Sequence, residues 1–223
     1  MPHYSKNTFI WTLFALFVGF AANLAMSRGN FSLDREVLRK AEGRYGKAAH
    51  DRLIAWEELI RQDRSSIDLD KLKLANNFFN SKIRFSNDYN VWGVHDYWAT
   101  PIELICKGAG DCEDFAIAKY FTLKAMGLPD EKLKITYVKA VQQNMHHMVL
   151  TYYSDPEAEP LVLDNLVDSI NPASKRTDLV PIFSFNGSGL WMAKQRGQGK
   201  MAGSANRIRL WQDLLQKMAE NSV

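Results

Sequence analysis

One cysteine of this chain lies in a setting that favours a reactive thiol. Cys112 follows a short glycine-rich stretch, Gly108–Gly110, and stands at the first turn of a predicted helix. Free N–H groups at a helix N-terminus stabilise an anion, and the thiolate is the nucleophilic form of cysteine. The glycines let the backbone approach a substrate closely. The pattern indicates nucleophilic catalysis. The competing interpretation is an inert, packed thiol, because free cysteines are often buried.

Three acidic residues surround this cysteine and oppose its ionisation. Asp111, Glu113 and Asp114 flank Cys112 in the sequence. Their negative charges would raise the pKa of the thiol by repulsion. A reactive Cys112 therefore needs an imidazolium, a bound cation or both to offset them. Alternatively, the acids only complement the helix dipole, which is worth about 0.3–1 kcal/mol for each charge.

A thiol protease also needs a base and a residue that orients the base. His147 lies near the start of a predicted strand, and Asp164 lies on the next one, beyond a turn at Asp155–Pro156. If the hairpin centres on that dipeptide, His147 faces Asp164 directly and shares a face of the sheet with it. His146 points to the other face and is the weaker candidate. Spacing alone leaves packing or surface roles open for both His147 and Asp164.

Other candidate sites are weaker. Cys106 lacks the surroundings of Cys112 and is expected to pack in the core. A zinc site built from both cysteines and the adjacent histidines is disfavoured, because ligands six residues apart in a loop-to-helix segment fit poorly. Several glycines lie between Asn186 and Asn206, but no strand followed by a helix brackets them. A nucleotide-phosphate loop is therefore not expected there.

The composition is that of a globular protein. Of its 223 residues, 46% are hydrophobic and 24% charged, which excludes collagen, a disordered tail and a polytopic membrane protein. The formal net charge is only +3, and no cluster of five basic residues occurs, so no nucleic-acid partner is expected. Two cysteines cannot form a disulfide framework.

The hydrophobic period changes from helical to strand-like along the chain. Spacings of three and four predict helices over 35–62 and 68–83, one from Asp111 to just before Gly127, and one from Ile208 to Met218. Alternation predicts strands over 133–137, 147–153 and 161–166. Segments 85–110 and 186–206 are expected to be loops. Helices followed by strands indicate an α+β fold, with a helix packed on an antiparallel sheet.

The N-terminus has the pattern of an export signal. Lys6 precedes an almost uncharged apolar run from Phe9 to Met26, and Arg28 follows it. This pattern predicts a signal peptide or membrane anchor over 1–27 and a catalytic domain over 28–223. The run is close to the ~20 residues that cross a bilayer, and its cleavage site is poor. We expect a periplasmic enzyme, either free or tethered to the inner membrane through residues 9–26.

The residues around the cysteine resemble a known family. The stretches Trp98–Leu104 and Gly108–Tyr120 are similar to those of the bacterial transglutaminase-like cysteine proteinases, in particular the periplasmic adhesin proteases among them. The resemblance covers most of the chain after the N-terminal segment. It implies a papain-like, transglutaminase-like fold with helices packed on an antiparallel sheet. By matching motifs, it also implies a catalytic triad of Cys112, His147 and Asp164.

The same resemblance implies a metal and partners. Such enzymes depend on calcium, and the resemblance assigns Asp111, Glu113 and Asp114 as ligands of Ca²⁺. It implies that the substrate is a large surface adhesin, cut near its N-terminus beside a pair of alanines, which releases the adhesin and disperses a biofilm. An inner-membrane cyclic di-GMP receptor is the implied inhibitory partner. The alternatives are a transglutaminase or a peptidoglycan endopeptidase with the same triad, and an inactive binding module.

Overall fold

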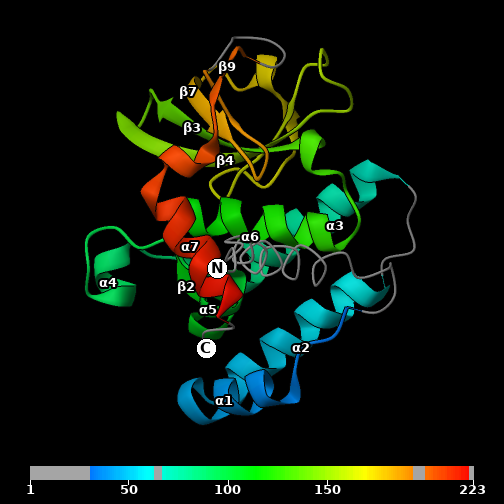
Figure 1. Ribbon diagram of the computed structural model, residues 1–223, viewed down its shortest axis with the longest axis vertical. Coiled ribbons are helices and arrows are strands. Elements are labelled where there is room, and N and C mark those ends of the chain that lie inside the picture. The colour runs from blue at the N-terminus through cyan, green and yellow to red at the C-terminus, as the bar shows by residue number, and fades with distance from the viewer. Residues whose placement is uncertain (1–30, 63–66, 193–198, 221–223) are drawn as a thin grey trace, which may run out of the picture.

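The chain folds as layers of helices against one antiparallel sheet. The computed structural model describes residues 31–62, 67–192 and 199–220. A central helix, α6 (Cys112–Ala125), runs beneath the sheet, and α1 (Arg35–Tyr45) and α2 (Lys47–Gln62) lie on the side of α6 away from the sheet (Figure 1). The predicted α+β architecture is confirmed. In the described part of the chain, every helix is too short or too polar to cross a bilayer.

The single helix predicted over 35–62 is wrong, because the chain breaks at Gly46. This glycine has φ of 83°, and its N–H caps α1 by donating to the Glu42 carbonyl at 2.8 Å. Glycine adopts a positive φ without steric cost, so the chain can turn here and begin α2. The helix predicted over 68–83 is confirmed as α3 (Asp68–Lys82).

Segment 85–110, predicted as a loop, contains short regular elements. They are β1 (Arg84–Phe85), α4 (Asp88–Trp92), α5 (Pro101–Lys107) and β2 (Ala109–Gly110). Helix α5 begins with a capping box, in which the Thr100 side chain accepts from the Glu103 N–H and Glu103 accepts from the Thr100 N–H. These reciprocal bonds satisfy N–H groups that a short helix would otherwise leave free. The many aromatic and Asn residues conceal this signal in the sequence.

The sheet has seven strands in the order β6-β5-β4-β3-β7-β8-β9. Their bounds are β3 (Leu133–Ala140), β4 (Met145–Tyr152), β5 (Leu161–Leu163), β6 (Asn171–Pro172), β7 (Leu179–Phe185), β8 (Leu190–Met192) and β9 (Met201–Gly203). The three predicted strands correspond to β3, β4 and β5. The loop predicted over 186–206 is wrong in part, because it contains β8 and β9. Both are three-residue strands among glycines, too short to show alternation.

An aromatic cluster fixes α6 against the sheet. Trp211, from the predicted closing helix α7 (Arg209–Ala219), packs against Phe121 of α6 and Phe185 of β7, with ring centroids 5.7 and 5.3 Å apart. Trp211 and Phe185 are both fully buried. Burial of such side chains is worth about 1.5–3 kcal/mol each. This packing fixes the C-terminal half of α6 against β7 and α7.

Candidate active site

Cys112 is the first residue of α6 and lies against the backbone of β4. Asp111 precedes the helix in extended conformation, and the Cys112 thiol donates a hydrogen bond to Glu113 Oε2 at 2.9 Å. The sulfur also accepts a hydrogen bond from the backbone N–H of Met148, the residue after His147. The helix start thus brings the thiol to the strand that carries the candidate base.

The repulsion predicted around Cys112 is present. Burial, followed by the charge of Glu113 and then that of Asp111, raises the pKa of the Cys112 thiol well above its usual value. The N–H of Met148 acts in the opposite direction but is outweighed. An active thiolate here therefore requires a positive charge that offsets these carboxylates.

His147 and Asp164 form a buried pair. His147 Nε2 lies 2.8 Å from Asp164 Oδ1, and the two side chains are 1% and 0% exposed. A carboxylate can only accept, so Nε2 carries the proton of the neutral ring. The other ring nitrogen, Nδ1, finds no hydrogen-bond partner among the described residues. Nδ1 is therefore the nitrogen available for proton exchange.

The register expected between these two strands is wrong by two residues. A pairing of His147 with Asp164 would place Leu150 opposite Leu161, but Leu150 pairs with Leu163. Asp164 consequently lies just beyond the end of β5 and not within the strand. A shift of two residues preserves the face of the sheet, whereas a shift of one would not. This is why the two side chains still meet.

The surroundings of Asp164 keep it ionised. Burial would raise the pKa of this carboxyl, but hydrogen bonds from His147, from the Leu166 N–H and from Arg176 outweigh it and hold the pKa at about 2. Asp164 is therefore a carboxylate across the physiological pH range. It can orient the imidazole and stabilise an imidazolium without taking up the proton.

The two weaker catalytic candidates, His146 and Cys106, lie apart from the His147–Asp164 pair. His146 is exposed, and its ring stacks on Tyr137 at 5.2 Å between centroids, on the opposite face of β4 from His147. Cys106 is 2% exposed within α5, and burial raises the pKa of its thiol to about 11. Both observations agree with the roles expected from the sequence.

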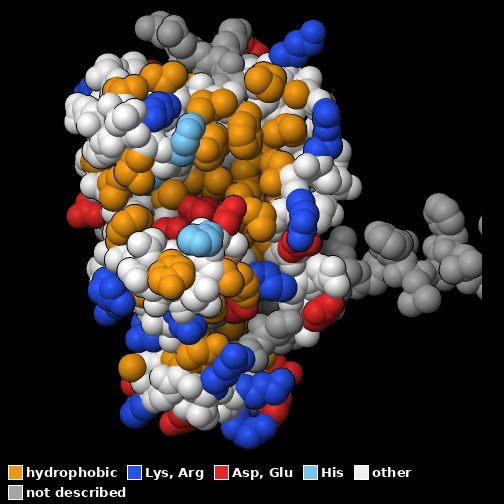
Figure 2. Space-filling model, turned by 90° about the vertical axis from the view of Figure 1, so that its left-hand side faces the viewer, with side chains coloured by type: hydrophobic (Ala, Val, Ile, Leu, Met, Phe, Trp, Pro, Cys, Tyr) orange, Lys and Arg blue, Asp and Glu red, His pale blue; other side chains and the backbone are white. Residues whose placement is uncertain are grey.

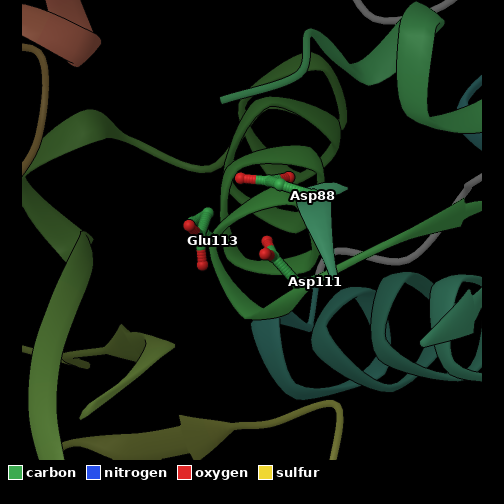
Figure 3. Close-up of side chains that lie close together, drawn as sticks. All are labelled: Asp88, Asp111 and Glu113. Atoms are coloured by element: carbon green, nitrogen blue, oxygen red, sulfur yellow. The ribbon is translucent and has the colours of Figure 1, made fainter. Parts of the chain in front are cut away.

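A cluster of three carboxylates lies beside Cys112. Asp88, Asp111 and Glu113 each offer an oxygen within 4.8 Å of the others (Figure 3). The sequence did not reveal Asp88, because 23 positions separate it from Asp111. The parallel pairing of Phe85 with Gly110 brings the start of α4 to the start of α6. Only this tertiary contact, and no spacing rule, places Asp88 at the site.

The chemistry of the cluster fits a hard cation. Asp88 Oδ1 and Asp111 Oδ1 are buried and lack a donor in the part of the chain that the structure describes. Burial raises the pKa of Asp88 to about 6, and burial with the charges of Glu113 and Asp114 raises that of Asp111 to about 10. Converging carboxylate oxygens without donors are the ligands that Ca²⁺ takes in proteins.

The structure places Asp114 outside this cluster. Its side chain is fully buried, and Oδ1 accepts the Ala99 N–H at 2.7 Å. The bond ties the segment before α5 to the first turn of α6. Its Oδ2 is buried and has no donor among the described residues, and the assignment of Asp114 as a calcium ligand stays a prediction.

Comparison with known proteins identifies the family. The model of the bacterial transglutaminase-like cysteine proteinases (BTLCP) matches residues 55–193. The chain belongs to this family. The family's α+β, papain-like fold agrees with the fold described above, so the expected fold and resemblance are both confirmed. A search of curated proteins found no match.

Solved structures of a family member are similar to this proteinase. Legionella pneumophila LapG is 40% identical, with a TM-score of 0.71, over 82% of this chain and 96% of that chain. Calcium-bound LapG from the same organism is 41% identical, with a TM-score of 0.70, over 83% of this chain and 99% of that chain. EGTA-treated LapG gives 41% identity and a TM-score of 0.72, over 82% and 96% of the two chains.

In this proteinase, Gly110 leaves no room for a side chain before the cysteine. A Cβ at this position would lie 2.4 Å from Leu104 Cδ1 and 2.5 Å from Asp114 Oδ2. We expect Gly110→Ala to lower the free energy of unfolding by about 1–3 kcal/mol, measured by urea denaturation. Gly43→Ala in α1 is the matched control, because no described atom lies within 4 Å of its Cβ. The control should be neutral or slightly stabilising. Equal stability of Gly110→Ala and the parent would contradict the crowding.

Proposed function

We propose that this chain is a calcium-dependent cysteine endopeptidase of the periplasm. Its substrate is a large surface adhesin, which it cuts in the N-terminal region beside a pair of alanines. The cut releases the adhesin and promotes biofilm dispersal. The observation that carries the proposal is the buried His147–Asp164 pair, whose histidine lies on the strand from which the Met148 N–H reaches the thiol of Cys112. Membership of a cysteine proteinase family and the likeness to LapG support it.

The proposed reaction uses the three side chains in turn. His147 Nδ1 takes the thiol proton, and Cys112 Sγ attacks the scissile carbonyl carbon. The tetrahedral oxyanion accepts a hydrogen bond from the backbone N–H of Cys112 at the start of α6. Nδ1–H then protonates the leaving amine, the peptide bond breaks, and a thioester remains. Water loses a proton to Nδ1, hydrolyses the thioester and restores the thiol. Asp164 holds Nε2–H throughout.

In the proposed calcium site, Asp88, Asp111 and Glu113 would hold the ion. The likeness to calcium-bound LapG supports this assignment, as do the convergent carboxylate oxygens. A bound cation would offset the negative charge that opposes ionisation of the neighbouring thiol. Backbone carbonyls and waters would complete the six to eight oxygens that calcium takes.

We expect EGTA to abolish cleavage and added calcium to restore it. Asp88→Asn and Asp111→Asn should weaken calcium binding, measured by calorimetry. Loss of a residue that only hydrogen-bonds to a metal ligand typically lowers metal affinity about 10–100-fold. Loss of a direct ligand should therefore lower it at least about tenfold. Asp213→Asn is the control, because that carboxylate is 53% exposed and pairs with Arg209 on α7. Unchanged cleavage in EGTA, with no calcium binding that either substitution removes, would refute the site.

The proposed domain boundaries are 1–27 for a signal peptide or anchor and 28–223 for the protease domain. The first segment lies outside the described residues.

We further propose that a cyclic di-GMP receptor of the inner membrane sequesters the enzyme. Figure 2 shows apolar side chains gathered on one face of the molecule, above a group of acidic ones. A face of this kind suits docking of an extended peptide or a partner protein.

Three assays separate this function from its alternatives. A peptide with paired alanines, incubated with calcium and a labelled amine, distinguishes hydrolysis from transfer. Free peptide fragments support the protease, and incorporated label supports a transglutaminase. Release of muropeptides from purified sacculi would indicate a peptidoglycan endopeptidase. A Cys112 thiol that does not react with iodoacetamide at neutral pH, with calcium present, would indicate a binding module.

A further inference from the structure

Arg176 bridges two carboxylates behind the candidate active site. It follows the short helix η2 (Ala173–Lys175), and its guanidinium is almost fully buried. Nε donates to Asp178 Oδ1 at 2.9 Å, and one terminal nitrogen donates both to Asp178 Oδ2 and to Asp164 Oδ2, each at 2.7 Å. The paired bonds to Asp178 fix the plane of the guanidinium, as a forked arginine–carboxylate contact does. The remaining bond reaches Asp164.

Each oxygen atom of Asp164 has at least one hydrogen-bond donor. Oδ1 accepts from His147 Nε2 at 2.8 Å and from the Leu166 N–H at 3.0 Å, while Oδ2 accepts from Arg176. The backbone carbonyl of Asp164 accepts from Asn80 Nδ2 at 2.9 Å and from Lys119 Nζ at 3.1 Å. A carboxylate bound at both oxygens cannot rotate about Cβ–Cγ without losing these bonds. Oδ1 therefore stays aimed at the histidine.

We propose that Arg176 is a positioning residue for proteolysis, which holds Asp164 so that His147 keeps the tautomer and ring orientation that Cys112 requires. This inference rests on the triad of the proposed function. Nothing in the sequence marks Arg176, because it follows Asp164 by 12 positions, beyond a separate strand. Arg176 acts through Asp164 and is not itself a catalytic residue.

The charges around Asp164 favour this role over a purely stabilising one. A buried ion pair contributes little net stability, because desolvation of both charges opposes their attraction. The groups that face Asp164 are His147 from β4, Lys119 from α6 and Arg176 from the segment after η2. Burial lowers the pKa of Lys119 to about 7, so this amine is a weaker source of positive charge. Arg176 stays charged at every accessible pH, which makes it the constant partner of the carboxylate.

The test combines ¹⁵N NMR of the histidine rings with steady-state kinetics. The His147 signals are identified by their loss in His147→Gln. In the parent protein, the neutral ring should carry its proton on Nε2. Arg176→Met should give a mixture of tautomers and lower kcat about 10- to 100-fold, the cost of misplacing a catalytic group by ~1 Å, with little change in KM. Arg176→Lys should recover part of kcat, because lysine reaches Asp164 but cannot form the fork with Asp178.

Lys132→Met is the matched control. It breaks a half-buried ion pair at 2.7 Å between Lys132, just before β3, and Asp68 at the start of α3, so it should cost stability and leave the His147 tautomer and kcat unchanged. If Arg176→Met does not fold, Asp178→Asn removes the fork and should show the same changes to a smaller extent. The proposal is overturned if the Arg176 and Asp178 variants that fold keep the Nε2 tautomer and the parent kcat.

Failure of this proposal can be distinguished from failure of the proposed function. The NMR measurement needs no substrate, so it reports on Arg176 even if the protein cleaves no adhesin. A parent protein with the Nε2 tautomer that cuts nothing would refute the function alone. Normal cleavage with an unchanged tautomer in Arg176→Met would refute the positioning role alone.

Discussion

Cys112→Ala is expected to abolish cleavage of the adhesin fragment and leave the fold intact. The thiol is the side chain that attacks the peptide bond in the proposed reaction, and loss of such a nucleophile typically costs about 10⁴-fold or more in kcat. The side chain is half-buried and donates one hydrogen bond, to Glu113, so alanine removes little packing. Circular dichroism and urea unfolding should therefore match the parent. Cleavage is followed by gel electrophoresis and mass spectrometry.

Cys106→Ala is the control for this substitution. Cys106 is buried in α5, so its loss costs packing but no chemistry. We expect slightly lower stability and substantial activity. Cleavage by Cys112→Ala at close to the parent rate would contradict the mechanism, whatever Cys106→Ala does.

His147→Ala should be as damaging to activity as the loss of Cys112. The substitution removes the base and leaves the buried carboxylate of Asp164 without one of its donors, so stability should fall as well. His147→Gln separates the two effects, because a side-chain amide can still donate to Asp164. This variant should be inactive but closer to the parent in stability. The measurements are kcat and the free energy of unfolding for each variant.

His146→Ala is the paired control on the neighbouring residue. This ring is exposed and stacks on Tyr137, so alanine should cause only a mild loss of activity. An inactive His146→Ala protein together with an active His147→Ala protein would reverse the assignment and would also discredit Asp164 as the orienting residue.

The sequence predicted the parts of the site that depend on local pattern. Cys112 at a helix start follows from the glycines before it and the apolar spacing after it. The face shared by His147 and Asp164 follows from strand alternation, which survives a register error of two residues. Gly46 could have predicted the break between α1 and α2, since glycine is the residue most often found just past the last turn of a helix.

What the sequence did not reveal depends on contacts between distant segments. Asp88 joins Asp111 only because β1 pairs with β2. The acidic run also gave no sign that Asp114 would be buried and would accept a hydrogen bond from the Ala99 N–H. Arg176 reaches Asp164 only once β5 and β6 have folded side by side. Hydrophobic periodicity along the chain does not predict such long-range contacts.

The most direct test of the account is mass spectrometry of an adhesin's N-terminal fragment after incubation with this protein. With calcium, we predict one cut beside a pair of alanines, with free carboxyl and amino termini at the new ends. The cut should be absent in EGTA and with Cys112→Ala. A fragment that stays intact in calcium, or the same cut made by Cys112→Ala, would contradict the proposal that Cys112, His147 and Asp164 form a calcium-dependent adhesin protease.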